Sequence, residues 1–71
     1  MVAEEPSRSV TKRLRKAGFH RTDAEGSHAK WIHPLGPWVS IAEGHRTISP
    51  GVVRQVNKAI EEARRLSKEK S

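Results

Sequence analysis

The sequence predicts an α+β fold with the element order α-β-β-β-α, a three-stranded antiparallel sheet with two helices packed on one face. Two observations support this. Apolar residues recur at helical spacing near both ends of the 71-residue chain. Between them lie short apolar segments of extended character, separated by stretches rich in Gly, Pro, Ser and Asp that are typical of turns. One face of the sheet is expected to carry both helices and the other to stay open.

The first helix is predicted to begin near Ser7 or Ser9, because either hydroxyl can accept a hydrogen bond from a free amide of the first turn. Three apolar residues share one face of this helix, namely Val10, Leu14 and Ala17. Gly18 is expected to end the helix in a left-handed conformation, with Phe19 folded back onto Leu14 as in a Schellman motif.

Three strands are predicted, over residues 19–22, 28–33 and 38–42. In the last of them Val39 and Ile41 share one face. Trp31 is expected to point inward, with Ile32 competing for that place. The two tryptophans serve either as core residues or as surfaces on which bases stack, and Trp38 is the better candidate for an exposed contact.

The second helix is predicted to begin with Ser49 as its cap and Pro50 at the first helical position, where the missing amide costs nothing. An apolar stripe follows at helical spacing, consisting of Val52, Val53, Val56, Ala59, Ile60 and Ala63. The chain is therefore expected to form one domain over residues 8–66, with a flexible tail at 1–7 and a frayed tail at 67–71.

The composition points to an anionic ligand. The chain has 14 Lys and Arg against 8 Asp and Glu, a net charge of +6, which favours an anionic polymer or an acidic protein as partner. It has no cysteine, and its four histidines lack the short spacings of zinc sites, so no metal or other cofactor is expected. No apolar run approaches the ~20 residues of a membrane span, and the N-terminus lacks the apolar core of a signal peptide. These features suit a cytoplasmic protein.

The most informative segment is Gly26-Ser27-His28, a small-residue turn that places a histidine at the head of a strand. An imidazole can accept or donate a proton near neutral pH. Lys30 projects from the same strand face and is a candidate for holding a phosphate, and the Ser27 hydroxyl is a candidate donor to a phosphate oxygen. In the alternative interpretation Gly26 and Ser27 only form the turn, and His28 is a half-exposed strand residue.

Other polar residues carry weaker signals. Arg54 and Lys58 lie one turn apart near the start of the second helix, where they either follow an RNA backbone or form a solvated helix face. His33 is expected at a strand end, on the face opposite His28. His45 lies in a predicted loop, and its role stays open.

Taken in order, several segments resemble the HicA toxin family: the KRLRKAGF helix end at 12–19, Gly26-Ser27-His28, His33-Pro34 before a glycine-containing hairpin, and Ser49-Pro50-Gly51. The resemblance spans residues 10–63. It implies a fold similar to the double-stranded-RNA-binding domain and the activity of a type II toxin, a metal-independent endoribonuclease that cleaves mRNA. It also implies a HicB-like antitoxin partner that covers His28, the residue that matches the family's catalytic histidine.

Two other hypotheses belong to different function classes. The segment Ala42-Glu43-Gly44-His45 stands where the family has Pro-x-His, which motivates a catalytically inactive module that binds nucleic acid or protein on the same fold. The positive helix faces motivate an adaptor that binds an acidic protein.

Overall fold

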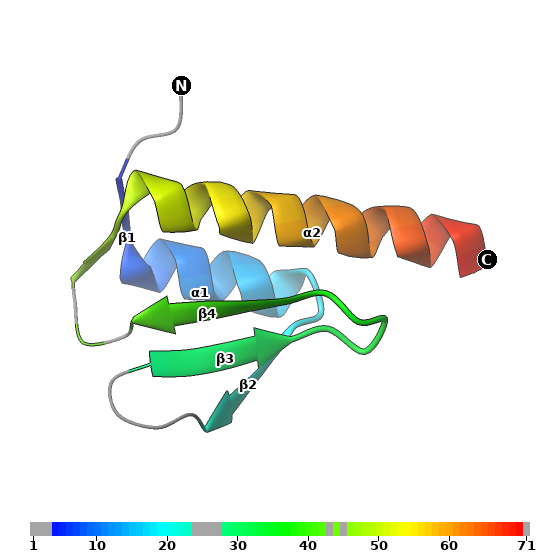
Figure 1. Ribbon diagram of the computed structural model, residues 1–71, viewed down its shortest axis with the longest axis horizontal. Coiled ribbons are helices and arrows are strands. Elements are labelled where there is room, and N and C mark those ends of the chain that lie inside the picture. Colours follow the sequence, from blue (N-terminus) through cyan, green and yellow to red (C-terminus); the bar gives the residue numbers. More distant parts are fainter. Residues whose placement is uncertain (1–3, 24–27, 43, 45, 71) are drawn as a thin grey trace.

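A computed structural model describes residues 4–23, 28–42, 44 and 46–70, and it has the predicted α+β architecture (Figure 1). Its elements are β1 (Glu5–Pro6), α1 (Ser7–Lys16), β2 (His20–Asp23), β3 (His28–Ile32), β4 (Trp38–Ala42), β5 (Thr47–Ile48) and α2 (Pro50–Lys70). The predicted order α-β-β-β-α is confirmed by α1, β2, β3, β4 and α2, and the arrangement agrees with that of a double-stranded-RNA-binding domain. The short β1 and β5, which were not predicted, form a second sheet.

The main sheet has the order β2-β3-β4, and both pairs of strands are antiparallel. Trp31 lies opposite Arg21 and Val39, whereas Lys30 lies opposite Thr22 and Ser40. Because directly opposed residues share a face and successive residues alternate, this register sorts the side chains into two sets. We call the set containing Trp31 the inner face and the set containing Lys30 the outer face.

The core lies between the inner face and the two helices. From the sheet it contains Ala29, Trp31, Val39 and Ile41, and from the helices Val10, Leu14, Val53, Val56, Ala59, Ile60 and Ala63. Trp31 is 1% exposed, which confirms that it points inward, while Ile32 is half-buried on the outer face. The helices therefore cover only one face of the sheet, as the alternation of the strands predicts.

The helix α1 begins at Ser7, as predicted, but its cap differs from the prediction. Its N-cap is Pro6 and no side chain caps it, so capping by Ser7 or Ser9 is wrong. Instead, β1 pairs with β5, and the Ser7 amide donates a hydrogen bond to the Arg46 carbonyl at 2.9 Å. A segment far away in the sequence thus supplies an acceptor for one of the free amides in the first turn of α1. Part of the predicted tail 1–7 is accordingly a strand.

The end of α1 follows the prediction. Gly18 has φ +96°, its amide donates to the Arg15 carbonyl, and the Phe19 amide donates to the Leu14 carbonyl at 3.0 Å. These two bonds define a Schellman motif, and they fold the buried Phe19 back toward the core.

The helix α2 begins at Pro50, as predicted, and the Val53 amide makes its first backbone hydrogen bond with the Ser49 carbonyl. It continues to Lys70, beyond the predicted domain end at residue 66. Neither described helix is long and apolar enough to span a membrane.

Candidate functional site

His28 is the first residue of β3 and is exposed on the outer face. The register places it opposite Ala42, the last residue of β4. It therefore stands at one end of the sheet, where β4 finishes and β3 starts (Figure 1). Neither described helix covers this face, and the His28 side chain is exposed there.

A cation and an aromatic ring lie on the same face as His28. The Lys30 ammonium is 4.4 Å from the centroid of the Trp38 ring, a cation–π contact. The Trp38 side chain is 57% exposed, which confirms the prediction that it is the exposed tryptophan. Lys30 is two residues from His28, about 6.7 Å along a strand. Trp38 thus holds the ammonium on the surface that also carries the imidazole.

The backbone under this cation is tied to its neighbouring strand. The Thr22 hydroxyl donates a hydrogen bond to the Lys30 carbonyl at 2.8 Å, in addition to the pairing of β2 with β3. The outer face also holds a second exposed histidine, His20, which lies opposite Ile32 at the other end of β3.

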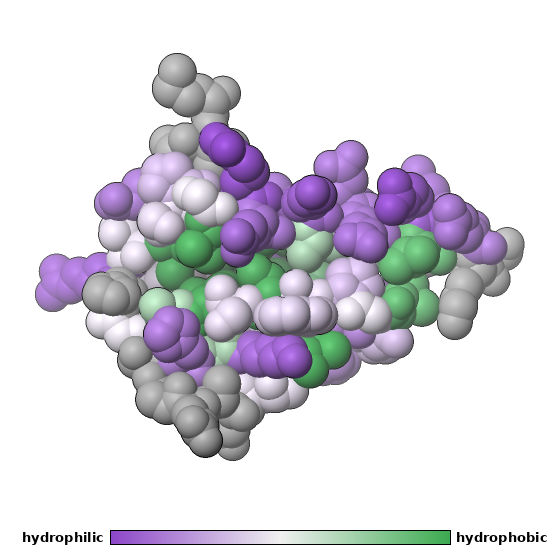
Figure 2. Space-filling model, viewed as in Figure 1, coloured by the Kyte–Doolittle hydropathy of each residue, from purple (hydrophilic) through white to green (hydrophobic). Residues whose placement is uncertain are grey.

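Of the remaining predicted site residues, those that the structure describes do not lie beside His28. Ser27 and His45 lie outside the described residues. Arg54 and Lys58 are exposed on α2, which packs on the inner side of the sheet, so the sheet separates this helix from the outer face. Hydrophilic side chains gather along this helix (Figure 2). The two residues belong to a surface distinct from that of His28.

His33 has a structural environment. Its ring contacts Phe19 edge-on, with centroids 5.1 Å apart, and its Nδ1 accepts a hydrogen bond from the Leu35 amide at 3.1 Å. It therefore joins the end of α1 to the turn between β3 and β4.

Among the residues that the structure describes, there is no group of three or more His, Cys, Asp or Glu that could hold a metal ion.

Comparison with known families supplies the context for these residues. The family model described as HicA toxin of bacterial toxin-antitoxin matches residues 7–64, more than half of the chain. The chain belongs to the HicA toxin family. Toxins of this family are generally ribonucleases, and their membership in toxin–antitoxin systems implies an antitoxin partner. No curated protein and no solved structure matches this HicA toxin.

The contact between Lys30 and Trp38 was not anticipated from the sequence. The sequence predicts Trp38 as an exposed contact, with base stacking or core packing as the two alternatives, and Lys30 as a phosphate ligand. The signal was present in the strand register, because Trp38 is opposite Ile32 and hence a diagonal neighbour of Lys30. To predict the contact, one must know the position of the turn between β3 and β4 to the residue, since a shift of one residue would put Trp38 on the inner face.

Proposed function

We propose that this HicA toxin is a metal-independent endoribonuclease that cleaves mRNA in the cytoplasm, with His28 as the group that transfers a proton. The observation that carries the proposal is an exposed histidine on the uncovered sheet face of a HicA-family chain, with the Lys30 cation two residues away. The match to the family supports the reaction class, and the geometry supports the residue.

The chemistry requires few groups. The ribose 2′ oxygen attacks the adjacent phosphorus, a P–O2′ bond forms, and the P–O5′ bond breaks. A base takes the proton from the 2′ hydroxyl, and an acid gives a proton to the leaving 5′ oxygen. An imidazole is suited to either transfer near neutral pH, so His28 acts as the base or the acid. Lys30 balances the negative charge that accumulates on the phosphate oxygens.

The first test is cleavage of a long single-stranded RNA by the purified protein in EDTA. His28→Ala is expected to lower the rate by at least about 100-fold, the usual contribution of general acid–base catalysis. His20→Ala is the matched control, because His20 is also exposed on the outer face but lies at the other end of β3, and its rate should stay at the parent level. A His28→Ala protein that cleaves at the parent rate would show that the proposed mechanism is wrong.

Lys30 is tested in the same assay. Lys30→Ala is expected to lower the rate by about 10- to 100-fold, less than a buried oxyanion donor contributes, because Lys30 is only half-buried. Lys30→Arg keeps the cation and should retain more activity than Lys30→Ala. Equal rates for the two variants would show that the positive charge of Lys30 does not stabilise the phosphate in the reaction.

We also propose that a HicB-like antitoxin covers His28. Expression of the parent chain alone in growing cells should arrest growth, and expression of His28→Ala to the same protein level should not. Unarrested growth with the parent, together with no cleavage in vitro, would favour a catalytically inactive binding module. Salt-dependent RNA affinity would then be the property to measure, because phosphate contacts release counterions.

A further inference from the structure

A groove runs between the end of α1 and the second half of α2. Its volume is about 360 Å³, and its apolar part is formed by Ala17, Ile60 and Ala63. Ile60 and Ala63 belong to the core, so the bottom of the groove is the outer surface of the packed helices. We call this feature the α1–α2 groove.

The polar side chains around the α1–α2 groove carry donors and positive charge. They are Arg13, Lys16, His33, Arg64 and Ser67, and no Asp or Glu is among the lining residues. Lys16 and Arg64 are exposed, and neither side chain forms a hydrogen bond or an ion pair within the part of the chain that the structure describes. Two unpaired cations from different helices therefore border one concave, partly apolar surface, which favours an anionic ligand.

Arg13 is committed to other contacts. Its Nη1 donates to the Asn57 side-chain carbonyl at 2.8 Å, and its Nη2 pairs with the Glu5 carboxylate. These two contacts hold the Arg13 guanidinium at the side of the groove, and the Glu5 carboxylate offsets its charge. The binding charge is thus supplied by Lys16 and Arg64.

His33 adds a neutral donor. Because its Nδ1 accepts the Leu35 amide hydrogen, the proton of a neutral ring lies on Nε2. This Nε2 stands next to Gly18, since a Cβ on that glycine would be only 3.1 Å from it. The Nε2–H is therefore at the end of α1, beside the groove that the ring lines.

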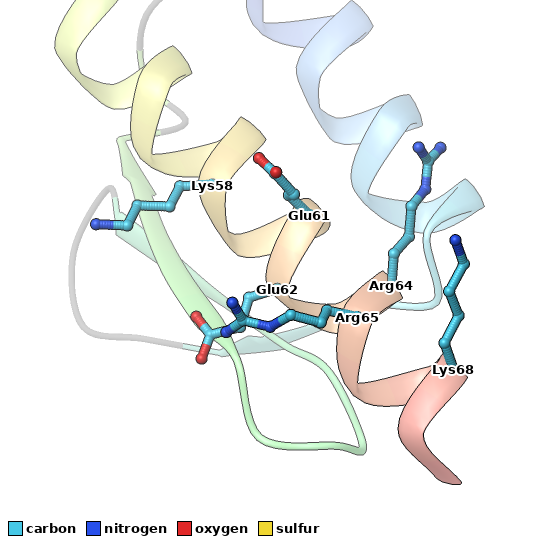
Figure 3. Close-up of a pocket in the computed structure, with 6 residues that line it drawn as sticks. All are labelled: Lys58, Glu61, Glu62, Arg64, Arg65 and Lys68. Atoms are coloured by element: carbon cyan, nitrogen blue, oxygen red, sulfur yellow. The ribbon is translucent and has the colours of Figure 1, made fainter. Parts of the chain in front are cut away.

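The neighbouring cavity on α2 has a different character. It is lined by two carboxylates, Glu61 and Glu62, as well as by cations, so its charge is mixed. Figure 3 shows the Arg64 side chain extending alongside α1, whereas that of Arg65 extends away from α1 toward Glu62. Arg64 lines both this cavity and the α1–α2 groove, whereas Arg65 lines this cavity and not the groove.

We propose that the α1–α2 groove binds a phosphate group of RNA, with Lys16 and Arg64 as its charged ligands. A single carboxylate side chain would leave most of the groove empty. A nucleotide instead places its phosphate against the cations and its ribose against the apolar residues. The inference rests on RNA as the ligand of this toxin, but not on His28 as the proton-transferring group.

The groove lies at the end of the sheet opposite to His28. His33 borders the groove and follows β3, whereas His28 begins that strand, and five residues of extended chain span about 17 Å. An RNA strand bound at both places would pass around the turn between β3 and β4. The groove is therefore a second contact for the RNA chain, separate from the site of cleavage.

The experiment measures binding of a fluorescent single-stranded RNA by anisotropy, with His28→Ala in every protein so that the RNA stays intact. Arg64→Ala is expected to weaken binding about tenfold and to reduce the slope of log K against log salt by about 0.7 to 1, the value for one lost phosphate contact. Lys16→Ala should act in the same direction. Arg65→Ala is the matched control, with the same charge change on the same helix, and should change affinity less than about twofold.

Equal effects of Arg64→Ala and Arg65→Ala would overturn the proposal, because they would reflect net charge alone. So would an unchanged RNA affinity of Arg64→Ala together with weakened binding of the antitoxin, which would assign the groove to a protein. Cleavage by the His28-containing chain distinguishes the two proposals. Groove-dependent RNA binding without cleavage overturns only the nuclease, and cleavage without groove-dependent binding overturns only the groove. Thermal unfolding of each variant confirms that the fold is intact.

Discussion

Three glycines allow the conformational cost of a side chain to be separated from its steric cost. Gly18 and Gly36 both have positive φ, +96° and +121°, a region that L residues rarely adopt. A Cβ on Gly36 would meet nothing within 4 Å, whereas a Cβ on Gly18 would be 3.1 Å from His33 Nε2. Gly51 lies in the first turn of α2, has no positive φ, and also has open space around it.

The magnitudes follow from these differences. Gly36→Ala carries about 1–2 kcal/mol of backbone strain, partly offset by the lower entropy of the unfolded chain, and should lower the free energy of unfolding by about 1 kcal/mol. Gly18→Ala adds an overpacked contact, because Phe19 and the Leu35 amide hold the His33 ring in place. We expect a total loss of about 2–3 kcal/mol. Gly51→Ala should stabilise the protein by about 0.4–1 kcal/mol.

The assay is urea unfolding followed by tryptophan fluorescence, with thermal unfolding alongside. For a domain of this size, 2–3 kcal/mol corresponds to a Tm lowered by about 8–24 °C. His33→Ala combined with Gly18→Ala should recover the steric part of the loss, which a double-mutant cycle isolates. Equal losses for Gly18→Ala and Gly36→Ala would show that His33 moves away freely, and no loss for either would refute the strain argument itself.

Substitutions at three other residues test the packing, the N-terminus and the outer face. The buried Trp31 Nε1 has no hydrogen-bond partner among the described residues. Trp31→Phe should therefore change the free energy of unfolding by less than about 1 kcal/mol. Trp31→Ala, which leaves a cavity, should lower it by more than about 3 kcal/mol, as measured by urea unfolding. Glu5→Gln removes the ion pair with Arg13 and should lower the free energy of unfolding by less than about 1 kcal/mol, with a smaller loss in high salt. A larger loss that does not depend on salt would mean that β1 itself is disrupted. Trp38→Ala should lower the RNA cleavage rate, as Lys30→Ala does, and should change the free energy of unfolding by no more than about 0.5 kcal/mol. Trp38→Phe keeps a ring under the Lys30 ammonium and should restore the rate.

Features controlled by neighbouring residues were predicted correctly. Gly18 followed by an apolar residue specifies a Schellman motif, and its hydrogen bonds connect residues only three and five positions apart. Pro50 at the start of α2 depends on the geometry of a single residue. The alternation in 38–42 assigns Val39 and Ile41 to the core because the period of a strand is two.

Features that depend on segments far apart in the chain were not predicted from the sequence. The two-residue β1 has no periodic signal, and it exists because β5, about forty residues later, passes beside it. Close to this pairing, the Arg46 carbonyl accepts the hydrogen bond of the Ser7 amide at the start of α1, which has no capping side chain.

The sequence by itself determined the order of α1, β2, β3, β4 and α2, the inward Trp31, the exposed Trp38 and the HicA resemblance, since each depends on local spacing or on a short motif. Only the tertiary structure decided that Lys30 rests on Trp38, that α2 lies on the other side of the sheet from His28, and that Lys16 and Arg64 border one groove. The physical reason is that strand register and helix packing bring these side chains together through contacts between elements, and the energy of such contacts leaves no periodic pattern in the chain.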